Sequence, residues 1–433
     1  MSHFPSHPDR SFPRLHPRPP KGWLNDPNGI HHVDGRWQVF FQYNPHAARH
    51  RRIMWGHVSS ADLLHWCDEG IAIAPRPGGG DEHGCWTGVG VLDDGVSTLL
   101  YSGVRDGSGR SEVMVARHDG EGFRQSTHVV ASMPDDDRVC IMRDPFVFEF
   151  EGWRWSIQCA GLTSGQPAVI LHDATDLTRW EYRGVLLDGT DEIAAMLPPA
   201  NAWECPQLVR VDDDWVLIVS FWLAGELTGV GYLLGTLATD HRNGLPRFAP
   251  RAAGLLDEGP CFYAPQAVQA GVADGGPERV LLWGWAREVA SEGVRGRTQE
   301  DSDAVGWSGT LTSVCEVVVE GDLVRLVPAR ELELLRGELL SGNALPDQAE
   351  IVLRGTGTVE LRLAVGGEEG QLIWHSYLTD TSTRILIDAS LIEIFPENTT
   401  STTLRAYPAN DEAYRLIAGP ELQIESWHLR VPE

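Results

Sequence analysis

The sequence predicts an all-β protein, a five-bladed β-propeller followed by a C-terminal β-sandwich. The first observation is a repeat: five aromatic-rich runs each follow an acidic or Gly-containing turn, and they begin at Asp34, Asp93, Glu151, Asp212 and Pro277. Their spacings of 59, 58, 61 and 65 residues are typical of strand-rich units stacked around one axis. The second is a turn-rich composition, with 46 Gly and 16 Trp. The third is a C-terminal remainder of short alternating runs between Gly, Asp and Pro turns, which is typical of a sandwich.

The 433 residues exceed one ordinary domain, so a second domain is expected after the repeats. The N-terminal residues are rich in Pro and His without a period, which indicates a solvated arm laid over the surface rather than a metal site. After the repeats, Leu332, Leu335 and Leu339 recur at helix-like intervals and predict a helical linker. We therefore expect an arm, a propeller, a helical linker and a sandwich at residues 1–20, 21–326, 327–340 and 341–433.

Composition excludes several classes of partner and site. The formal net charge of −26 argues against nucleic acid or an anionic membrane, which require a basic surface, and fits a neutral ligand. No run approaches the roughly 18–20 apolar residues of a membrane span, and the N-terminus has no signal-like apolar core. We expect a cytoplasmic protein, or a secreted one if an export signal has been removed. The seven scattered cysteines lack CxxC spacing, which indicates buried thiols rather than disulfides or zinc ligands, and we expect no metal and no cofactor.

Short motifs stand just upstream of each repeat turn, and three of them carry a carboxylate beside a proline: NDPNG, RDP and ECP. Aligned on proline, four repeats place a proline at one position, and the second repeat has Trp86 there. These prolines are Pro27, Pro145, Pro206 and Pro265. Equivalent positions of successive blades lie at one height around the axis. The carboxyl groups of Asp26, Asp144 and Glu204 are therefore predicted to converge at one end of the central channel.

Three acids at a channel mouth suit glycosidic bond cleavage, which needs one acid to protonate the leaving oxygen and one carboxylate on the opposite face. Asp26, held in a tight Asn-Pro-Gly turn, suits a nucleophile. Glu204, in the motif WECP with apolar neighbours, suits the proton donor because those neighbours disfavour its charged form. Asp144 stands beside Arg143, which we expect to keep it ionised so that it holds substrate hydroxyls and stabilises positive charge.

Most of the 16 Trp are expected to pack the blades. Trp55, Trp86 and Trp285 fall near the acidic motifs or at repeat ends that face the channel. Aromatic faces stack on sugar rings, so these three are candidates for substrate contact.

The ordered motifs WLNDPNG, FFQYNP, WGHVSSADLLHW, GCWTG, RDP, ECP and FYAPQ, followed by GWSGTLT, RILIDASLIEIF and TTLRAYP, strongly resemble glycoside hydrolase family 32. That family contains invertases, fructanases and fructosyltransferases, and the resemblance runs from about residue 18 to the C-terminus. It implies a propeller with a β-sandwich and a retaining mechanism without a metal, through a covalent fructosyl-enzyme intermediate. By resemblance, Asp26 is the nucleophile, Glu204 the acid/base and Asp144 the transition-state stabiliser.

The resemblance also implies a fructose pocket and marks two departures from the family pattern. The pocket would draw on Asn25, Gln42, Trp55, Trp86, Thr87, Arg143, Tyr263 and Trp285. Trp86-Thr87 stands where Phe-Ser is usual, and Cys261 stands where bacterial relatives often carry Asp. We expect Asp257 to take over part of the role of that missing acid.

Several functions stay open at this point. The first is hydrolysis of terminal β-fructosyl linkages in sucrose, fructo-oligosaccharides, inulin or levan. A fructosyltransferase or a fructan-specific exo-hydrolase would use the same three acids. A non-catalytic carbohydrate-binding propeller is the remote alternative, and the presence of all three acids argues against it. The C-terminal sandwich is expected to stabilise the chain or to form a homo-oligomer.

Overall fold

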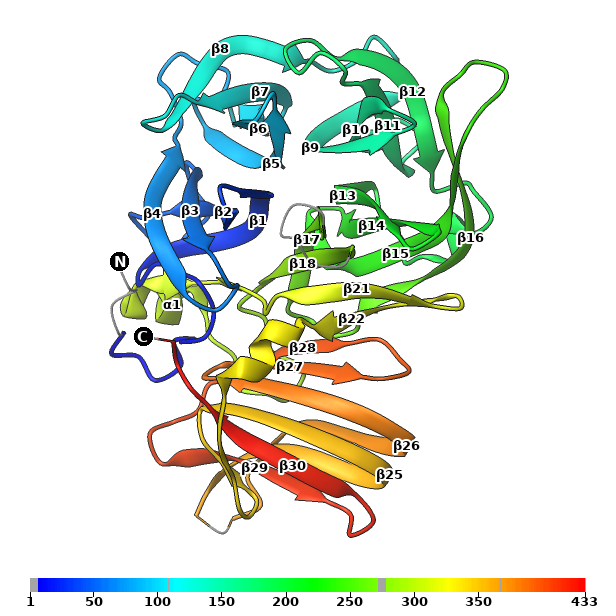
Figure 1. Cartoon of the computed structure of the whole chain (residues 1–433). Coiled ribbons are helices and arrows are strands. Elements are labelled where there is room, and N and C mark those ends of the chain that lie inside the picture. The colour runs from blue at the N-terminus through cyan, green and yellow to red at the C-terminus, as the bar shows by residue number, and fades with distance from the viewer. Residues whose placement is uncertain (1–6, 108, 272–277, 367, 433) are drawn as a thin grey trace.

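The computed structural model describes residues 7–107, 109–271, 278–366 and 368–432. Its β-sheets form a ring of blades above a C-terminal β-sheet domain (Figure 1). The innermost strand of each blade contacts the innermost strand of the next, and the fifth returns to the first. The predicted five-bladed propeller is therefore confirmed, and its axis is lined by one strand from every blade.

The first four blades are antiparallel sheets whose strands run outward from the axis in chain order. Blade 1 holds β1 (Gly22–Val33), β2 (Arg36–Asn44), β3 (Met54–Ser60) and β4 (Trp66–Ile73). Blade 2 holds β5 (Gly84–Asp93), β6 (Val96–Val104), β7 (Ser111–His118) and β8 (Phe123–Ala131). Blade 3 holds β9 (Val139–Phe150), β10 (Trp153–Leu162), β11 (Pro167–Asp173) and β12 (Glu181–Asp188). After the 3₁₀ turn η1 (Ala194–Met196), blade 4 holds β13 (Ala202–Val211), β14 (Asp214–Leu223), β15 (Glu226–Thr239) and β16 (Pro246–Asp257).

The fifth blade is interrupted by the segment that closes the ring. It comprises β17 (Phe262–Ala270), β18 (Arg279–Ala286), β21 (Cys315–Glu320) and β22 (Leu323–Pro328), with β20 (Thr310–Leu311) paired to β18. Between β18 and β21 the chain forms α1 (Gln299–Val305) and β19 (Trp307–Ser308). β19 pairs in parallel with the start of β1, Gly22 with Trp307 and Trp23 with Ser308. The first blade is thus completed by a late segment of the chain.

The repeat seen in the sequence is the hairpin turn between the first and second strands of each blade. In three blades this turn has two residues, both with positive φ: Asp34-Gly35, Asp94-Gly95 and Glu151-Gly152. Two-residue turns of this kind match the twist of antiparallel strands, which explains the Asp-Gly and Glu-Gly pairs at a fixed interval. The fifth repeat start, Pro277, lies outside the described residues.

The N-terminal arm, expected to be solvated, is wedged between the two domains in its described part. The guanidinium of Arg18 is fully buried, lies over the rings of Phe12 and Trp307 at 5.1 and 4.8 Å, and donates to the carbonyl of Gly309. His16 is also buried, and its ring nitrogens lie 2.7 Å from Asp388 and 3.2 Å from Glu393. Composition showed the lack of regular structure, but the partners Gly309, Asp388 and Glu393 lie 291–377 residues away in sequence.

The helical linker predicted over 327–340 is reduced to a single short 3₁₀ helix. β22 continues to Pro328, a 3₁₀ turn η2 covers Arg330–Leu335, and β23 (Arg336–Leu339) already pairs with the last strand of the C-terminal domain. Leu335 is buried whereas Leu339 is 67% exposed. Leu332 and Leu335 both pack against the core from η2, whereas Leu339 lies in β23, so the three leucines do not form one helical face.

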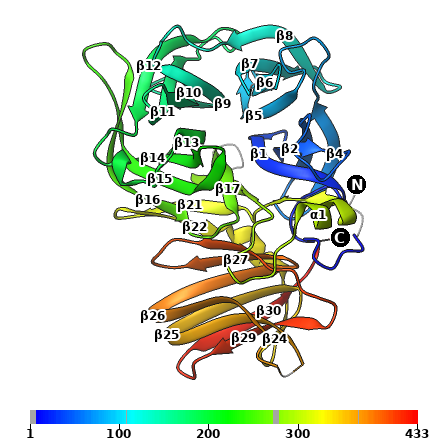
Figure 2. The same cartoon turned by 180° about the vertical axis from the view of Figure 1, so that it is seen from behind.

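The C-terminal domain is a sheet that folds around one core, as its strands in yellow to red show (Figure 2). Its strands are β23, β24 (Ala344–Leu345), β25 (Gln348–Val365), β26 (Gln371–Asp388), β27 (Leu391–Pro396), β28 (Thr402–Arg405), β29 (Glu412–Ala418) and β30 (Gln423–Leu429). The first half of β25 pairs with β30 and its second half with β29. The change falls at Gly355 and Gly357, whose positive φ values of 112° and 158° suit glycine. Both halves contribute to the same buried cluster.

Along the stretches that the structure describes, no helix is both long and apolar enough to cross a membrane.

We predict that Gly309→Ala destabilises the ring closure. Gly309 has φ 73°, and a Cβ there would collide with the carbonyl of Leu24, next to Asn25 and Asp26. The matched control is Gly321→Ala, because Gly321 has φ 65° but no atom within 4 Å of the added Cβ. The control should lose about 1 kcal/mol from the backbone effect alone, whereas Gly309→Ala should lose several-fold more, measured as thermal unfolding. Equal losses in the two variants would contradict this.

Candidate active site

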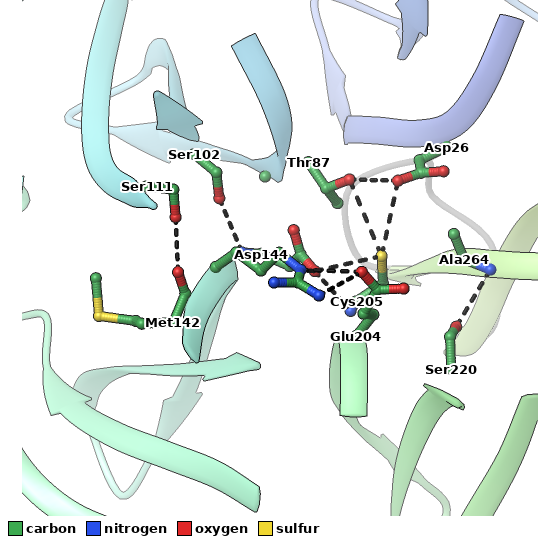
Figure 3. A network of polar contacts seen from close by, with 12 residues as sticks. Asp26, Thr87, Ser102, Ser111, Met142, Asp144, Glu204, Cys205, Ser220 and Ala264 are labelled. Atoms are coloured by element: carbon green, nitrogen blue, oxygen red, sulfur yellow. Dashed lines mark hydrogen bonds and ion pairs between the residues drawn. The ribbon is translucent and has the colours of Figure 1, made fainter. Parts of the chain in front are cut away.

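The three predicted acids sit where each inner strand departs from regular pairing. In every blade, two consecutive residues of the inner strand oppose one residue of the second strand, so each inner strand has a β-bulge at the same level. The bulged pairs are Asn25-Asp26, Trp86-Thr87, Asp144-Pro145, Cys205-Pro206 and Ala264-Pro265. Bulges redirect side chains out of the sheet plane, and here they bring the side chains of Asp26, Thr87, Asp144 and Cys205 toward one another from four blades (Figure 3).

The pairing corrects the proline alignment by one residue in the first two blades. Pro145, Pro206 and Pro265 are equivalent, but Pro27 follows its bulge, and the proline position is held by Asp26 in blade 1 and by Thr87, not Trp86, in blade 2. The acids therefore hold three different bulge positions: Glu204 precedes its bulge, Asp144 is first in its pair and Asp26 is second. Because the three acids hold different positions along their inner strands, their carboxyl groups can approach one another from three different blades.

Three bulges have left-handed backbone, and their amides bond to the preceding blade. Asp144, Cys205 and Ala264 have φ values of 57°, 48° and 44°. The Asp144 amide donates to Ser102 Oγ at 2.8 Å, the Cys205 amide to Asp144 Oδ2 at 3.1 Å and the Ala264 amide to Ser220 Oγ at 3.2 Å (Figure 3). Such backbone costs free energy and persists only where surrounding contacts hold it. The hydrogen bonds from these three amides to the preceding blade stabilise the left-handed backbone at the site.

Asp26 is buried and accepts three side-chain hydrogen bonds. Asn25 Nδ2 lies 2.9 Å from one oxygen, and Gln42 Nε2 and Thr87 Oγ1 lie 3.0 and 2.5 Å from the other. Burial raises the pKa of Asp26 to about 6, Glu204 adds repulsion, and the bonds from Thr87 and Asn25 oppose the rise. These donors hold one rotamer, so Asp26 is an oriented carboxylate above about pH 6.

Asp144 faces Asp26 across the sulfur of Cys205. Cys205 Sγ lies 3.8 Å from Asp26 Oδ2 and 3.8 Å from Asp144 Oδ2. The expectation that Arg143 keeps Asp144 ionised is corrected: burial raises the pKa of Asp144 to about 7, and the Arg143 guanidinium, 3.8 Å away, only opposes this in part. Arg143 is instead turned toward Glu204.

Glu204 is held at both oxygens. Arg143 Nε and Nη2 lie 2.9 and 2.8 Å from Oε1, and Tyr263 Oη lies 2.7 Å from Oε2. The apolar setting predicted from WECP is only part of the environment, since a cation and a phenol contact the carboxyl directly. Glu204 also keeps 15% side-chain exposure, so it faces the open end of the site.

An arc of aromatic rings, which we call the aromatic rim, runs around the site. It consists of Trp86, His50, Trp23, Trp285 and Tyr263, with successive ring centroids 5.7, 6.1, 5.6 and 6.5 Å apart. Sequence reasoning missed both His50, which lies outside the acidic motifs, and Trp23, although Trp23 is the first residue of the motif WLNDPNG that carries Asp26. The rim supplies apolar ring faces and edges beside the carboxylates.

Trp55 does not belong to the rim. Its side chain has no exposed area, it packs in the core with Phe40 and Tyr101, and its indole N–H donates to the Trp86 carbonyl at 3.1 Å. Predicted stacking of Trp55 on a sugar is therefore wrong in this structure, and its role is to support Trp86 from below.

Asp257 and Cys261 also lie away from the site. Asp257 is buried against the C-terminal domain, where its carboxylate accepts from Ser401 Oγ, Thr403 Oγ1 and the amide of Thr403 at 2.8–3.0 Å. The thiol of Cys261 is fully buried and donates to the Val289 carbonyl. The expectation that Asp257 replaces a missing pocket acid is thus contradicted, because its oxygens are used in joining the domains.

Gln266 forms the floor below the acids. Its buried amide accepts from the Ile30 amide at 2.9 Å and donates to the Gly88 carbonyl at 2.7 Å, so it bridges from blade 5 to blades 1 and 2 across the channel. Gln266 therefore ties three blades together in the channel beside the acids. The motif YAPQ that contains Gln266 was visible in the sequence, but an amide that spans a channel leaves no local signal.

Comparison with known proteins places the fold and site in a family. Residues 16–328 match the model of the glycosyl hydrolases family 32 N-terminal domain. The chain belongs to glycoside hydrolase family 32. It is a glycosidase of the β-fructosidase type, and the three carboxyl groups lie within the residues matched.

Relatives in this family extend over nearly the whole chain. Raffinose invertase of Escherichia coli is 30% identical over 92% of this chain and 90% of its own. The sucrose-6-phosphate hydrolase of Klebsiella pneumoniae is 30% identical over 89% of this chain and 86% of its own. Among solved structures, the family 32 β-fructofuranosidase of Bombyx mori has a TM-score of 0.79 at 25% identity, covering 98% of this chain and 95% of that one.

We predict that Asp144→Asn stabilises the protein at alkaline pH. The folded-state pKa of about 7 lies above the ordinary value of roughly 4, so the stabilising contribution of this group is complete below about pH 4 and is lost as pH rises through 7. Asn avoids the buried charge and keeps an acceptor for the Cys205 amide. The unfolding temperature should rise relative to the parent at pH 8, by the equivalent of about 1–4 kcal/mol, and change little at pH 4.

The control for this prediction is Asp388→Asn. His16 and neighbouring amides hold the pKa of Asp388 below its usual value despite burial. That variant should therefore lose stability at pH 8. A stabilised Asp388→Asn, or an Asp144→Asn with the same effect at both pH values, would contradict the assignment.

Proposed function

We propose that this protein is a retaining β-fructofuranosidase that releases terminal fructose from a sucrose-type substrate. Asp26 acts as nucleophile, Glu204 as acid/base and Asp144 as stabiliser of the transition state. The observation that supports this most is the shared geometry: Asp26 and Asp144 both contact one sulfur, while Asp144 and Glu204 both approach one guanidinium.

In the first step, an Asp26 oxygen bonds to the anomeric carbon of fructose as the bond from that carbon to the leaving oxygen breaks. Glu204 gives its proton to the leaving oxygen, which departs as a hydroxyl. Asp144 faces the positive charge that develops on the sugar ring. In the second step, Glu204 takes a proton from water, the water oxygen bonds to the anomeric carbon, and Asp26 leaves as a carboxylate.

The hydrogen-bond partners of Asp26 suit this role. Three donors fix the rotamer of Asp26 and favour its charged form. The pKa of Asp26, raised to about 6, leaves the carboxylate basic enough to attack yet ionised at neutral pH.

The same geometry serves fructosyl transfer if a sugar hydroxyl replaces water as the acceptor. The products formed at high sucrose concentration distinguish the two outcomes.

A recess beside the aromatic rim, with two arginines in its lining, favours a second candidate substrate. This recess has a volume of about 440 Å³, and its charged and aromatic lining consists of His50, Arg51, Arg52, His83 and Trp86 together with the carboxyl groups of Glu82 and Asp106. Among the described residues, neither Arg51 nor Arg52 forms an ion pair, although the protein carries a net charge of −26. Sucrose 6-phosphate, the substrate named for the Klebsiella pneumoniae relative, differs from sucrose by one phosphate, and guanidinium groups recognise phosphate well.

For the catalytic assignment, we predict that Asp26→Asn lowers kcat/KM for sucrose by about 10⁴-fold or more, since it removes the nucleophile. Glu204→Gln should lower it by about 10²–10⁴-fold. The Gln variant should retain more activity on β-D-fructofuranosyl fluoride, whose leaving group needs no proton. Asp257→Asn serves as the control carboxylate, and NMR of the first product should show retained β configuration.

For the recess, we predict that the double variant Arg51→Ala/Arg52→Ala loses about 10–100-fold in kcat/KM for sucrose 6-phosphate, from lost charge-assisted bonds. Its activity on sucrose should stay within about twofold, since no charge is then recognised. Arg49→Ala is the matched control, because Arg49 is paired with Asp303 and lies outside the recess lining. Equal losses on both substrates would rule out phosphate recognition here.

A further inference from the structure

The two oxygens of Glu204 have partners of different kinds. Arg143 directs two N–H groups at Oε1, at 2.9 and 2.8 Å. A guanidinium stays charged and cannot accept a hydrogen bond. A proton on Oε1 would therefore face two donors, so the acid form of Glu204 carries its proton on Oε2.

Oε2 lies 2.7 Å from the hydroxyl of Tyr263, which has a choice of two acceptors. Tyr263 Oη is also 3.1 Å from the carbonyl oxygen of Phe221. A phenol has one hydrogen and donates to one acceptor at a time. The Phe221 carbonyl can only accept, and Thr228 Oγ1 at 3.3 Å supplies it with another donor when Tyr263 turns away.

The direction of the Tyr263 hydroxyl therefore follows the state of Glu204. With a proton on Oε2, Glu204 donates to Tyr263, and Tyr263 donates to Phe221. When Oε2 has lost that proton, Tyr263 donates to Oε2 instead. This second bond is charge-assisted, and such bonds are stronger than neutral ones.

The surroundings keep Tyr263 in place and protonated. Its side chain is 2% exposed, and the Arg287 guanidinium lies 5.2 Å from its ring centroid. Arg287 is itself fixed by the carbonyls of Leu227 and Pro260. Burial, with the nearby carboxylate of Glu204, raises the pKa of Tyr263 well above its usual value, so the phenol remains a donor.

We propose that Tyr263 is a positioning residue for proton transfer, whose hydroxyl turns from the Phe221 carbonyl to Glu204 as Glu204 gives its proton to the leaving group. This inference rests on the proposed function and goes beyond a sugar-contact role for Tyr263. The new bond forms as charge develops on Glu204, so it lowers the barrier of the step rather than the free energy of substrate binding.

The test compares two substrates in Tyr263→Phe. For sucrose, which requires protonation of its leaving oxygen, kcat should fall by about 10–100-fold with KM little changed. For β-D-fructofuranosyl fluoride, whose leaving group needs no proton, kcat should stay within about twofold. Inhibition by free fructose should be unaltered, because the proposed role of Tyr263 is exerted on Glu204 and not on the sugar.

Tyr414→Phe is the matched control. Tyr414 is fully buried in the C-terminal domain, and its hydroxyl donates to the Ala389 carbonyl at 2.7 Å. This variant measures the effect of losing a buried tyrosine hydroxyl that is remote from the site, and kcat for both substrates should be unchanged.

If Tyr263→Phe does not fold, 3-fluorotyrosine at position 263 keeps the ring and makes the hydroxyl a stronger donor. It should change kcat for sucrose by at least about twofold and leave the fluoride unchanged.

Two results would overturn the inference: equal losses on both substrates, or weakened inhibition by fructose, which would mark Tyr263 as a sugar contact. A parent enzyme that cleaves neither substrate would instead overturn the proposed function on which the inference rests.

Discussion

The site depends on one break in the hydrogen-bond ladder, repeated at the same level of every inner strand. Without the bulges, inner-strand side chains would alternate between the two faces of each blade and would pack against neighbouring blades. With them, Asp26, Asp144 and Glu204 turn toward the axis from three staggered positions. The amides released from the ladder bond from one blade to the next, so the same distortion that aims the acids also holds adjacent blades in register.

Burying three carboxyl groups together has an electrostatic cost, and each of the three is stabilised by different partners. One guanidinium, Arg143, serves Glu204 closely and Asp144 at longer range. Asp26 forms no ion pair within the described part of the chain and is stabilised by neutral donors instead. The pKa values of Asp26 and Asp144 are raised as a result. Different environments for chemically similar groups are what allow them to take different roles in one reaction.

The sequence predicted the ring, the C-terminal domain and the convergence of the acids because all three follow from periodicity. A hairpin turn such as Asp34-Gly35 has a local chemical signature, and its repetition counts the blades. Trp55, Asp257 and His16 were misjudged because their surroundings are built from distant segments. The packing of Trp55 beneath Trp86, the bonds from Asp257 to Thr403 and the contact of His16 with Asp388 have no local pattern. The stagger of the acids depends on a one-residue shift in pairing, which a proline alignment cannot show.

Ring closure by β19 has a consequence for the order in which the protein is made. The strand that carries Asp26 is synthesised before its parallel neighbour, Trp307–Ser308, which follows almost 300 residues later in the chain. Until that segment arrives, β1 lacks its parallel neighbour and its contacts with the fifth blade, so the ring that sets Asp26 opposite Glu204 is still open. A nascent chain with four finished blades therefore carries all three carboxyl groups and still has no assembled catalyst, so activity begins only once the fifth blade has returned to the first.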